Sequence, residues 1–307
     1  MLVDLHTHTT SSDGTFKPKE LVERAKLIGI EVLAITDHDT VSAFNEINGL
    51  YEQDEEITVI MGVEISADYP TDSLHILGFN FKDIKTVGRV LDELIEYRNK
   101  RNEIILEKMN NMGFKVTFEE LREIAKGEAV GRPHFARIMV KKGYVKSIDE
   151  AFELYLRVGG PLFVEKKRLR PEEAIKLIKD SGGIAILAHP YEIIKGKPED
   201  SSEDELTFLE NYIKKLVSFG LDGIEAFYST HTPSQTRKLL EIANKYNLLI
   251  TAGSDFHGDN RPSVRRKFID NRIIEVAVNC HGKGSRYRCC CHDKYIRIFA
   301  LFPEGRP

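Results

Sequence analysis

The chain has 307 residues, of which 41% are hydrophobic and 30% are charged, and its formal net charge is −4. No apolar run approaches the roughly 20 residues that a membrane helix needs, and the weakly acidic balance gives no electrostatic basis for avid binding to duplex nucleic acid. The N-terminus lacks the order of basic, apolar and small residues that marks a signal peptide, because Asp4 and His6 interrupt it. We therefore expect a cytoplasmic protein that has no membrane partner.

The cysteines separate the C-terminal end from the rest of the chain. All four lie within 264–307, at Cys280, Cys289, Cys290 and Cys291, so the body has no disulfide framework and a reducing compartment is indicated. A small metal knuckle is one interpretation of these cysteines. It is disfavoured because three adjacent thiols cannot comfortably reach one tetrahedral ion, and because Cys-X2–4-Cys spacing is absent. We interpret 264–307 as an atypical tail, disordered or aberrant.

The first predicted strand ends in a pair of histidines. In an extended segment, residues two apart point to the same side, so His6 and His8 can present two imidazoles to one point. Asp13 follows after a polar turn that Gly14 closes. Two imidazoles and a carboxylate are typical ligands for zinc, manganese or iron.

Short apolar segments then alternate with helical ones. Helices are predicted at 18–28 and 41–51, and strands at 31–36, 57–66 and 74–79. Side chains that bind metals accompany these strands, namely Asp37 and His38 after the first, Glu64 near the end of the second and His75 inside the third. Strands that alternate with helices predict a parallel α/β sheet or barrel, in which polar groups at the strand ends form the site.

The pattern from 85 to 164 is helical, and no strand is predicted there. Helices are predicted at 87–112, from the capping box Thr117-Phe-Glu-Glu120 onward, after Arg132-Pro-His134 and at 148–158. We expect this segment to be a helical insertion in the α/β domain.

The alternation of strands and helices returns from 165 to 263. Strands are predicted at 184–188, 222–227 and 248–252, with helices at 201–219 and 233–246, and the strands lead to His189, His231 and Asp255-Phe-His257. We therefore divide the chain into a first barrel part at 1–84, an insertion at 85–164, a second barrel part at 165–263 and a tail at 264–307.

The polar residues at the strand ends form a pattern that scattered surface histidines would not produce. Six of the eight histidines before the tail lie at or near a strand end with an acid or imidazole as partner. The candidate ligands are His6, His8, Asp13, His38, Glu64, His75, His189, Asp255 and His257. They exceed the about four ligands that one zinc takes, so two or three divalent ions are predicted, and Glu64 can offer one oxygen to each of two ions. Ligands without sulfur favour Mn, Zn or Fe.

These motifs resemble the PHP (polymerase and histidinol phosphatase) metallophosphoesterases over residues 1 to about 263. The resemblance rests on DLHTHTTSSDG, ITDHDT, GVEIS, HILGF, AHP and GSDFHGDNRP, which occur in the order found in the family. GRPHFARIMVKKGY and the segment around FVEKKRLRPEEA resemble the branch of 3′,5′-nucleoside bisphosphate phosphatases and RNase AM-like 5′-to-3′ exoribonucleases. The resemblance implies a distorted (β/α)7 barrel whose helical insertion caps the substrate.

The resemblance also implies three metal positions. The first would be held by His6, His8, Glu64 and Asp255, the second by Glu64, His75 and His189, and the third by Asp13, His38 and His257. Asp13 and His38 would thereby take part in catalysis. The tail departs from the family pattern, which continues with a final strand and helix.

Three further residues are candidates for contact with the substrate. The Arg132 guanidinium can fork onto phosphate oxygens, and His134 can add a donor; the alternative is that both only flank a helix start. His231 could contact the phosphate or protonate the leaving oxygen in catalysis, or it could be an ordinary loop histidine.

The predicted activity is hydrolysis of a nucleotide phosphate monoester, a 3′,5′-nucleoside bisphosphate or an AMP-like substrate, by a metal-bridging hydroxide that attacks phosphorus in line. A 5′-to-3′ exoribonuclease acting on short RNA is an alternative. Histidinol-phosphate phosphatase is another, although the GRPH insertion argues against it. A non-catalytic metal-binding module is opposed by the intact ligand set, and an amidohydrolase by the absence of a lysine at a strand end.

Overall fold

The structure, a computed structural model, describes residues 2–51, 54–71, 74–125, 130–165 and 167–258. The predicted tail at 264–307 lies outside them. The chain forms two compact units. Of the described residues, one unit contains those up to Gly88 and those from Leu169 to Gly258, and the other lies within Arg89–Arg168, which overlaps the predicted insertion. Within the described part of the chain, no helix is long and apolar enough to cross a membrane.

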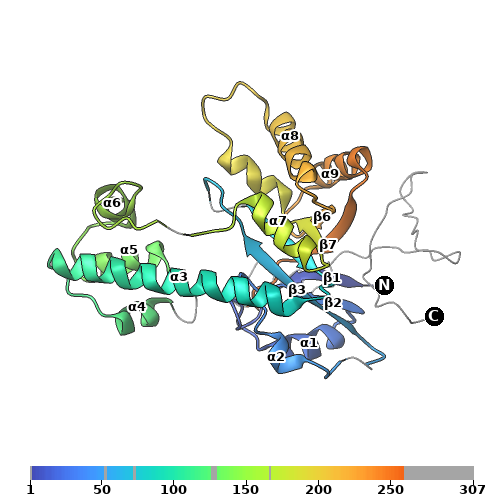
Figure 1. Cartoon of the computed structure of the whole chain (residues 1–307), viewed down its shortest axis with the longest axis horizontal. Coiled ribbons are helices and arrows are strands. Elements are labelled where there is room, and N and C mark those ends of the chain that lie inside the picture. The colour runs from blue at the N-terminus through green and yellow to red at the C-terminus, as the bar shows by residue number, and fades with distance from the viewer. Residues whose placement is uncertain (1, 52–53, 72–73, 126–129, 166, 259–307) are drawn as a thin grey trace, which may run out of the picture. The chain divides into compact units, whose positions relative to one another are not determined.

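The first unit is built on a seven-stranded sheet whose strands follow one another in chain order (Figure 1). The strands are β1 (Val3–Thr7), β2 (Val32–Ile35), β3 (Thr58–Ser66), β4 (His75–Phe79), β5 (Ile184–Leu187), β6 (Gly223–Tyr228) and β7 (Leu249–Gly253). A parallel bridge joins Thr7 to Phe256, just beyond β7, so the sheet nearly closes on itself. The predicted α/β barrel is confirmed, and it is distorted by one strand.

That strand is β4, which runs antiparallel to both β3 and β5, whereas the other neighbouring pairs are parallel. The connection from Ala67 to Leu74 is too short for the crossover of about a dozen residues that a parallel strand needs. The chain therefore turns back, and Ser66 pairs with His75. His75 is thus the first residue of β4 rather than an interior one, and it lies at the edge of the sheet where β3 ends.

An irregularity in β1 decides which side chains enter the barrel. Leu5 belongs to the apolar barrel core, while its neighbour His6 faces Glu64 from β3. Adjacent residues of a regular strand would point to opposite faces. The register between β1 and β2 shifts between Asp4 and Thr7, as in a β-bulge, and this shift turns His6 and His8 inward.

Helices surround the sheet of the first unit. They are α1 (Pro18–Leu27), α2 (Phe44–Ile47), α7 (Pro171–Asp180), the 3-10 helix η2 (Pro190–Gly196), α8 (Glu205–Ser218) and α9 (Pro233–Tyr246). The helix predicted at 41–51 is reduced to α2. The helix predicted at 201–219 begins only at Glu205, because the Asp204 carboxylate caps it by accepting hydrogen bonds from the N–H groups of Leu206 and Thr207, each at 3.1 Å.

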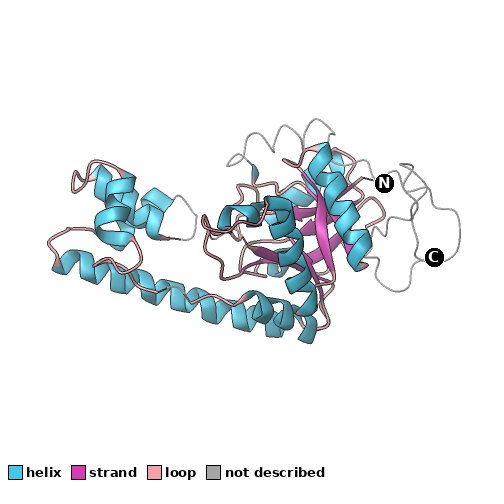
Figure 2. Ribbon diagram, turned by 90° about the horizontal axis from the view of Figure 1, so that it is seen from above, coloured by secondary structure: helices cyan, strands magenta, loops and turns pink. Residues whose placement is uncertain are grey.

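The second unit consists of helices joined by loops, and its described residues form no strand (Figure 2). Its elements are most of α3 (Ile84–Asn111), α4 (Phe118–Ala125), α5 (Arg132–Lys141), α6 (Ile148–Ala151) and the π-helical turn η1 (Phe152–Leu156). The predicted capping box starts α4, since Thr117 N–H donates to Glu120 Oε2 at 2.9 Å and Glu120 N–H donates to Thr117 Oγ1 at 3.3 Å. A separate apolar core, including Phe135 and Met139, holds the unit together.

Candidate metal centre

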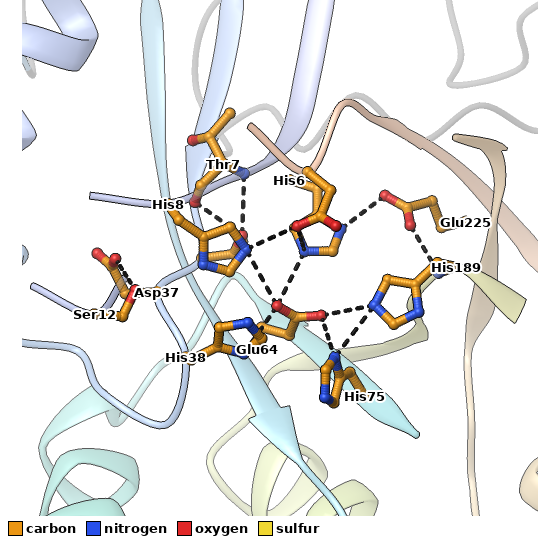
Figure 3. A network of polar contacts seen from close by, with 12 residues as sticks. His6, Thr7, His8, Ser12, Asp37, His38, Glu64, His75, His189 and Glu225 are labelled. Atoms are coloured by element: carbon orange, nitrogen blue, oxygen red, sulfur yellow. Dashed lines mark hydrogen bonds and ion pairs between the residues drawn. The ribbon is translucent and has the colours of Figure 1, made fainter. Parts of the chain in front are cut away.

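Imidazoles from several strand ends converge on the fully buried Glu64 of β3 (Figure 3). Its Oε2 lies 3.1 Å from His6 Nε2, 3.2 Å from His8 Nε2 and 3.1 Å from His38 Nδ1. Its Oε1 lies 2.9 Å from His75 Nδ1 and 3.0 Å from His189 Nε2. The two oxygens of one carboxylate therefore face two different sets of histidines.

The first group of donors has the dimensions of a metal site. It contains His6, His8, Glu64 and Asp255. Asp255 Oδ1 lies 3.5 Å from His6 Nε2 and 3.3 Å from His8 Nε2. Ligand atoms at tetrahedral corners around zinc are about 3.4 Å apart, as expected for bonds of about 2.1 Å. The donor separations match this value.

The lack of hydrogen bonds to three of these ligand atoms among the described residues also fits a bound cation. Within the described structure, His6 Nε2, His8 Nε2 and Glu64 Oε2 are buried and make no hydrogen bond of acceptable geometry, although they lie close to one another. Buried polar atoms are normally paired, because an unpaired one costs about 1–3 kcal/mol. A divalent ion at the centre of the group would satisfy all three atoms.

A second set surrounds the other oxygen of Glu64. His75 and His189 both approach Oε1, and His75 Nδ1 lies 3.2 Å from His189 Nε2. His38 also belongs to a group with Glu64 and His75. The resemblance to the family placed His38 in the third set alone, whereas its Nδ1 here faces Glu64.

The third set lies around Asp13. Its members are His8, Asp13, His38 and His257. Asp13 Oδ1 lies 3.3 Å from His257 Nε2 and 3.7 Å from His8 Nδ1. His8 thus presents one ring nitrogen to each of two groups. All nine residues predicted as ligands from the sequence lie in this one cluster.

Strained backbone holds two of these residues. His189 has φ 27° and Asp255 has φ 58°, in the left-handed region that residues other than glycine rarely adopt. Such conformations cluster at functional sites, where the surrounding structure must hold them. Each residue lies two positions beyond a barrel strand, His189 after β5 and Asp255 after β7, and its side chain enters the cluster.

Comparison with known proteins identifies the family of this chain. Residues 4–215 match the model of the PHP domain. The chain belongs to the PHP domain family. It is 35% identical over 260 residues to a 5′-3′ exoribonuclease of Haemophilus influenzae, which covers 83% of this chain and 89% of that protein.

Two further relatives support a PHP phosphoester hydrolase. A 3′,5′-nucleoside bisphosphate phosphatase of Chromobacterium violaceum is 29% identical over 257 residues, covering 83% of this chain and 87% of the relative. A solved structure from Bifidobacterium adolescentis, assigned to the metal-dependent phosphoesterases, has a TM-score of 0.62 and 28% identity, with coverage of 85% and 89%. The predicted family, fold and enzyme class are confirmed: the chain is a PHP phosphoester hydrolase with candidate metal-binding clusters.

The PHP cluster opens to solvent on one side. The side chains of His6, His8 and Glu64 are 0% exposed, whereas Asp13 is 33% exposed and His38 is 21% exposed. His75 of the second set is 17% exposed and His257 of the third set is 2% exposed, so the open side is lined by Asp13, His38 and His75.

The electrostatics of the PHP cluster favour ionised carboxylates. Burial raises the pKa of Glu64, but the imidazoles of His38, His6 and His75 outweigh burial and hold it well below its usual value. Burial lowers the pKa of His38 to about 3, whereas the carboxylates of Glu64 and Asp255 outweigh burial and raise the pKa of His8 to about 9 and that of His6 above its usual value, so these two rings would lose a proton on binding an ion. An ionised carboxylate and a neutral imidazole are the protonation states that ligate metals.

A buried acid outside the ligand set holds the turn that carries Asp13. Thr9 N–H and Thr9 Oγ1 donate to the two oxygens of Asp37, each at 2.7 Å, and Ser12 Oγ donates to Asp37 Oδ1 at 2.6 Å. Gly14 completes the turn, because a Cβ there would overlap the His8 carbonyl. The sequence pattern indicates Asp37 only as a residue of a type that can bind metal, next to His38.

Two other buried acids were missed by sequence reasoning. Asp4 accepts hydrogen bonds from Ser254 Oγ at 2.6 Å and from Ser254 N–H at 2.9 Å, and burial raises its pKa to about 7. Glu225 of β6 contacts His6 and the backbone of His189. The available signal was a single acid between apolar residues of a strand, Asp4 between Val3 and Leu5 and Glu225 between Ile224 and Ala226.

His231 lies one aromatic ring away from the cluster. Its ring packs against Tyr228 with centroids 5.1 Å apart, and Tyr228 in turn lies 5.5 Å from the His189 ring. His231 Nδ1–H donates to the Ala226 carbonyl at 3.2 Å, and burial lowers the pKa of the ring. The catalytic and phosphate-binding roles of His231 stay predictions.

Arg132 and His134 belong to the second unit, where their contacts are local. His134 is buried, and its Nδ1 accepts a hydrogen bond from Gly131 N–H at 3.1 Å at the start of α5. Arg132 Nη1 donates to the Leu156 carbonyl at 3.4 Å, and the guanidinium lies 5.8 Å from the centroid of the Phe163 ring. The hydrogen bond of His134 is that of a helix start, whereas Arg132 contacts the segment from η1 to Phe163. Phosphate binding by the pair stays a prediction.

Proposed function

We propose that this PHP protein hydrolyses a phosphate monoester of a nucleotide, a 3′,5′-nucleoside bisphosphate or an AMP-like substrate. The proposal rests on the two carboxylate oxygens of Glu64. Its Oε2 and Oε1 face separate sets of histidines at 2.9–3.2 Å. A carboxylate placed in this way can bridge two ions. Buried donors without sulfur suit Mn, Zn or Fe.

Two or three divalent ions would be held by the sets described above. His6, His8, Glu64 and Asp255 would hold the first, Glu64, His75 and His189 the second, and Asp13, His38 and His257 the third, with His38 also close to the first two. When bound, such ions supply a water of lowered pKa and positive charge that offsets the charge of the phosphoryl group.

The protein residues determine where the substrate binds. Buried His6, His8 and Glu64 close the floor of the site, so a phosphate would approach from the side of the exposed ligands, which include Asp13 and His38 together with His75. Asp13 and His38 are therefore assigned to the catalytic face. His231 would contact the phosphate or protonate the leaving oxygen there, and Arg132 and His134 would bind a second phosphate or the nucleotide.

Short RNA is the second candidate substrate. It is favoured because the Haemophilus influenzae relative, at 35% identity, is named a 5′-3′ exoribonuclease, whereas the relative named a bisphosphate phosphatase has 29% identity. Both activities break a phosphoester bond at a nucleotide end, so the same cluster can serve either. A small mononucleotide and a short 5′-phosphorylated RNA must therefore be compared directly.

The test is phosphate and nucleotide release by the full chain loaded with Mn²⁺ or Zn²⁺. Adenosine 3′,5′-bisphosphate, AMP, histidinol phosphate and a 5′-phosphorylated RNA of a few nucleotides are offered separately. We expect phosphate release from the bisphosphate or AMP, and its loss in Glu64→Gln but not in the exposed control Glu31→Gln. Turnover of histidinol phosphate alone would refute the nucleotide assignment. Metal binding without turnover of any substrate would favour the non-catalytic module.

A further inference from the structure

Glu225 of β6 touches the candidate metal centre without belonging to any of its ligand groups. Its side chain is 1% exposed. Its Oε1 lies 3.0 Å from His6 Nδ1, and its Oε2 accepts a hydrogen bond from His189 N–H at 2.8 Å (Figure 3). One carboxylate thus contacts a histidine from each of the two sets that surround Glu64.

The contact with His6 determines which nitrogen of that ring can bind a metal. A carboxylate only accepts hydrogen bonds, so it favours the tautomer with the proton on Nδ1 and the lone pair on Nε2. His6 Nε2 is the atom that lies 3.1 Å from Glu64 Oε2 and 3.5 Å from Asp255 Oδ1. The opposite tautomer would direct an N–H into the first ligand group.

The contact with His189 stabilises a strained backbone. His189 has φ 27° and ψ 63°, and it lies two residues after the end of β5. Its N–H is held by Glu225 Oε2, while its Nε2 lies 3.0 Å from Glu64 Oε1. Fixing the N–H therefore fixes the direction in which the ring leaves the backbone.

The neighbouring strand leaves space for this arrangement. Gly253 ends β7, and a Cβ at this position would overlap both His6 Cβ and Glu225 Oε1. A side chain at 253 is therefore incompatible with the contact between His6 and Glu225. Three strands therefore contribute to this contact: β1 carries His6, β6 carries Glu225, and β7 leaves space at Gly253.

We propose that Glu225 is a positioning residue that sets the tautomer of His6 and the backbone of His189, and thereby the metal affinity of two positions at once. The inference rests on the metal assignment of the proposed function. Carboxylates that hold a ligating histidine from behind typically change metal affinity 10- to 100-fold, because they orient the ring and raise its basicity.

The decisive variant is Glu225→Gln, which keeps the size of the side chain. Both partners of Glu225 are hydrogen-bond donors, but an amide offers only one acceptor oxygen, so its NH₂ group must face either His6 Nδ1 or His189 N–H. We expect Mn²⁺ affinity, followed by the electron paramagnetic resonance signal of free Mn²⁺, to fall about 10- to 100-fold.

Asp222→Asn is the matched control for this variant. Asp222 precedes β6 and accepts a hydrogen bond from the backbone N–H of Ala185 in β5 at 2.8 Å, so it makes the same kind of link between the same two strands. It has no contact with the ligand groups in the described structure. We expect Asp222→Asn to lower the melting temperature and to leave Mn²⁺ affinity within about two-fold of the original.

Metal affinity distinguishes a positioning role from a structural one. Unchanged Mn²⁺ affinity in Glu225→Gln would overturn the proposal, even if the melting temperature fell. If this variant does not fold, Glu225→Asp decides, because its shorter carboxylate can reach only one partner: about 10-fold weaker binding supports the proposal and wild-type affinity overturns it. This experiment measures metal affinity and not nucleotide hydrolysis. Its result can therefore be interpreted even if the proposed substrate is not hydrolysed.

Discussion

Replacing Asp37 by Asn tests whether a buried acid outside the ligand set holds the Asp13 turn. Asp37 is 1% exposed and accepts three hydrogen bonds of 2.6–2.7 Å from Thr9 and Ser12. A hydrogen bond to a charged group is worth about 1.5–3 kcal/mol. Asn removes the charge, so every bond that remains is a weaker neutral one, and its NH₂ group can replace Oδ2 only if the Thr9 hydroxyl accepts instead of donates. We expect the free energy of unfolding in denaturant to fall by about 2–3 kcal/mol.

The control is Asp83→Asn at the start of α3. Asp83 is exposed and accepts from Thr86 N–H at 3.1 Å and from Thr86 Oγ1 at 2.6 Å, the same pair of bonds that Asp37 makes with Thr9. Water replaces these bonds, so the expected cost is about 0.5–1 kcal/mol. Equal destabilisation in the two variants would show that burial adds nothing at Asp37, and the reasoning would fail.

Three further outcomes follow from the structure. Truncating Phe135, 0% exposed in the core of the second unit, to Ala should cost about 3–5 kcal/mol in denaturant unfolding and leave Mn²⁺ affinity unchanged. The Lys245 ammonium, 2.6 Å from Glu210, lowers the pKa of that carboxyl, so the ion pair stabilises the fold above the unfolded pKa and is lost as pH falls through the folded one. Glu210→Gln should therefore cost about 0.5 kcal/mol at pH 7, and this cost should disappear in melting experiments as the pH falls through the lowered pKa. Chelation of divalent ions should lower the melting temperature, by the equivalent of about 2.7 kcal/mol at a Mn²⁺ concentration 100 times Kd, but should have little effect on Glu64→Gln.

Local sequence pattern was sufficient where the ligands lie close together in the chain. His6 and His8 share one side of a strand, and a polar turn returns Asp13 to His8 Nδ1 at 3.7 Å. The bridging position of Glu64 was expected because a glutamate offers two oxygens, and in the structure those oxygens face separate histidine sets. Elements with strong helix-start signals, such as α4 after Thr117, were also predictable.

Strand direction was not predictable from periodicity. An alternating pattern says which residues share a face but not whether the next strand runs parallel or antiparallel. His75 therefore looked like an interior strand residue, whereas the short connection from Ala67 reverses β4 and places His75 at the edge of the site. The bulge in β1 could not be predicted from the sequence either, because it is defined by a shift in the pairing register between β1 and β2.

The three acids buried inside apolar strands show how the remaining positions could be found. Asp4, Glu64 and Glu225 are each at most 1% exposed, and each interrupts an apolar strand. A buried carboxylate is costly unless it is paired or hydrogen-bonded, so such an interruption requires a partner somewhere in the fold. For Glu64, the histidine motifs in the sequence were sufficient to predict its partners. Asp4 accepts from the Ser254 hydroxyl and Glu225 contacts the His6 ring, and each acid also accepts from a backbone N–H distant in sequence, that of Ser254 for Asp4 and that of His189 for Glu225. Every residue except proline has such a group, so the sequence can reveal that these acids need a partner but not which one.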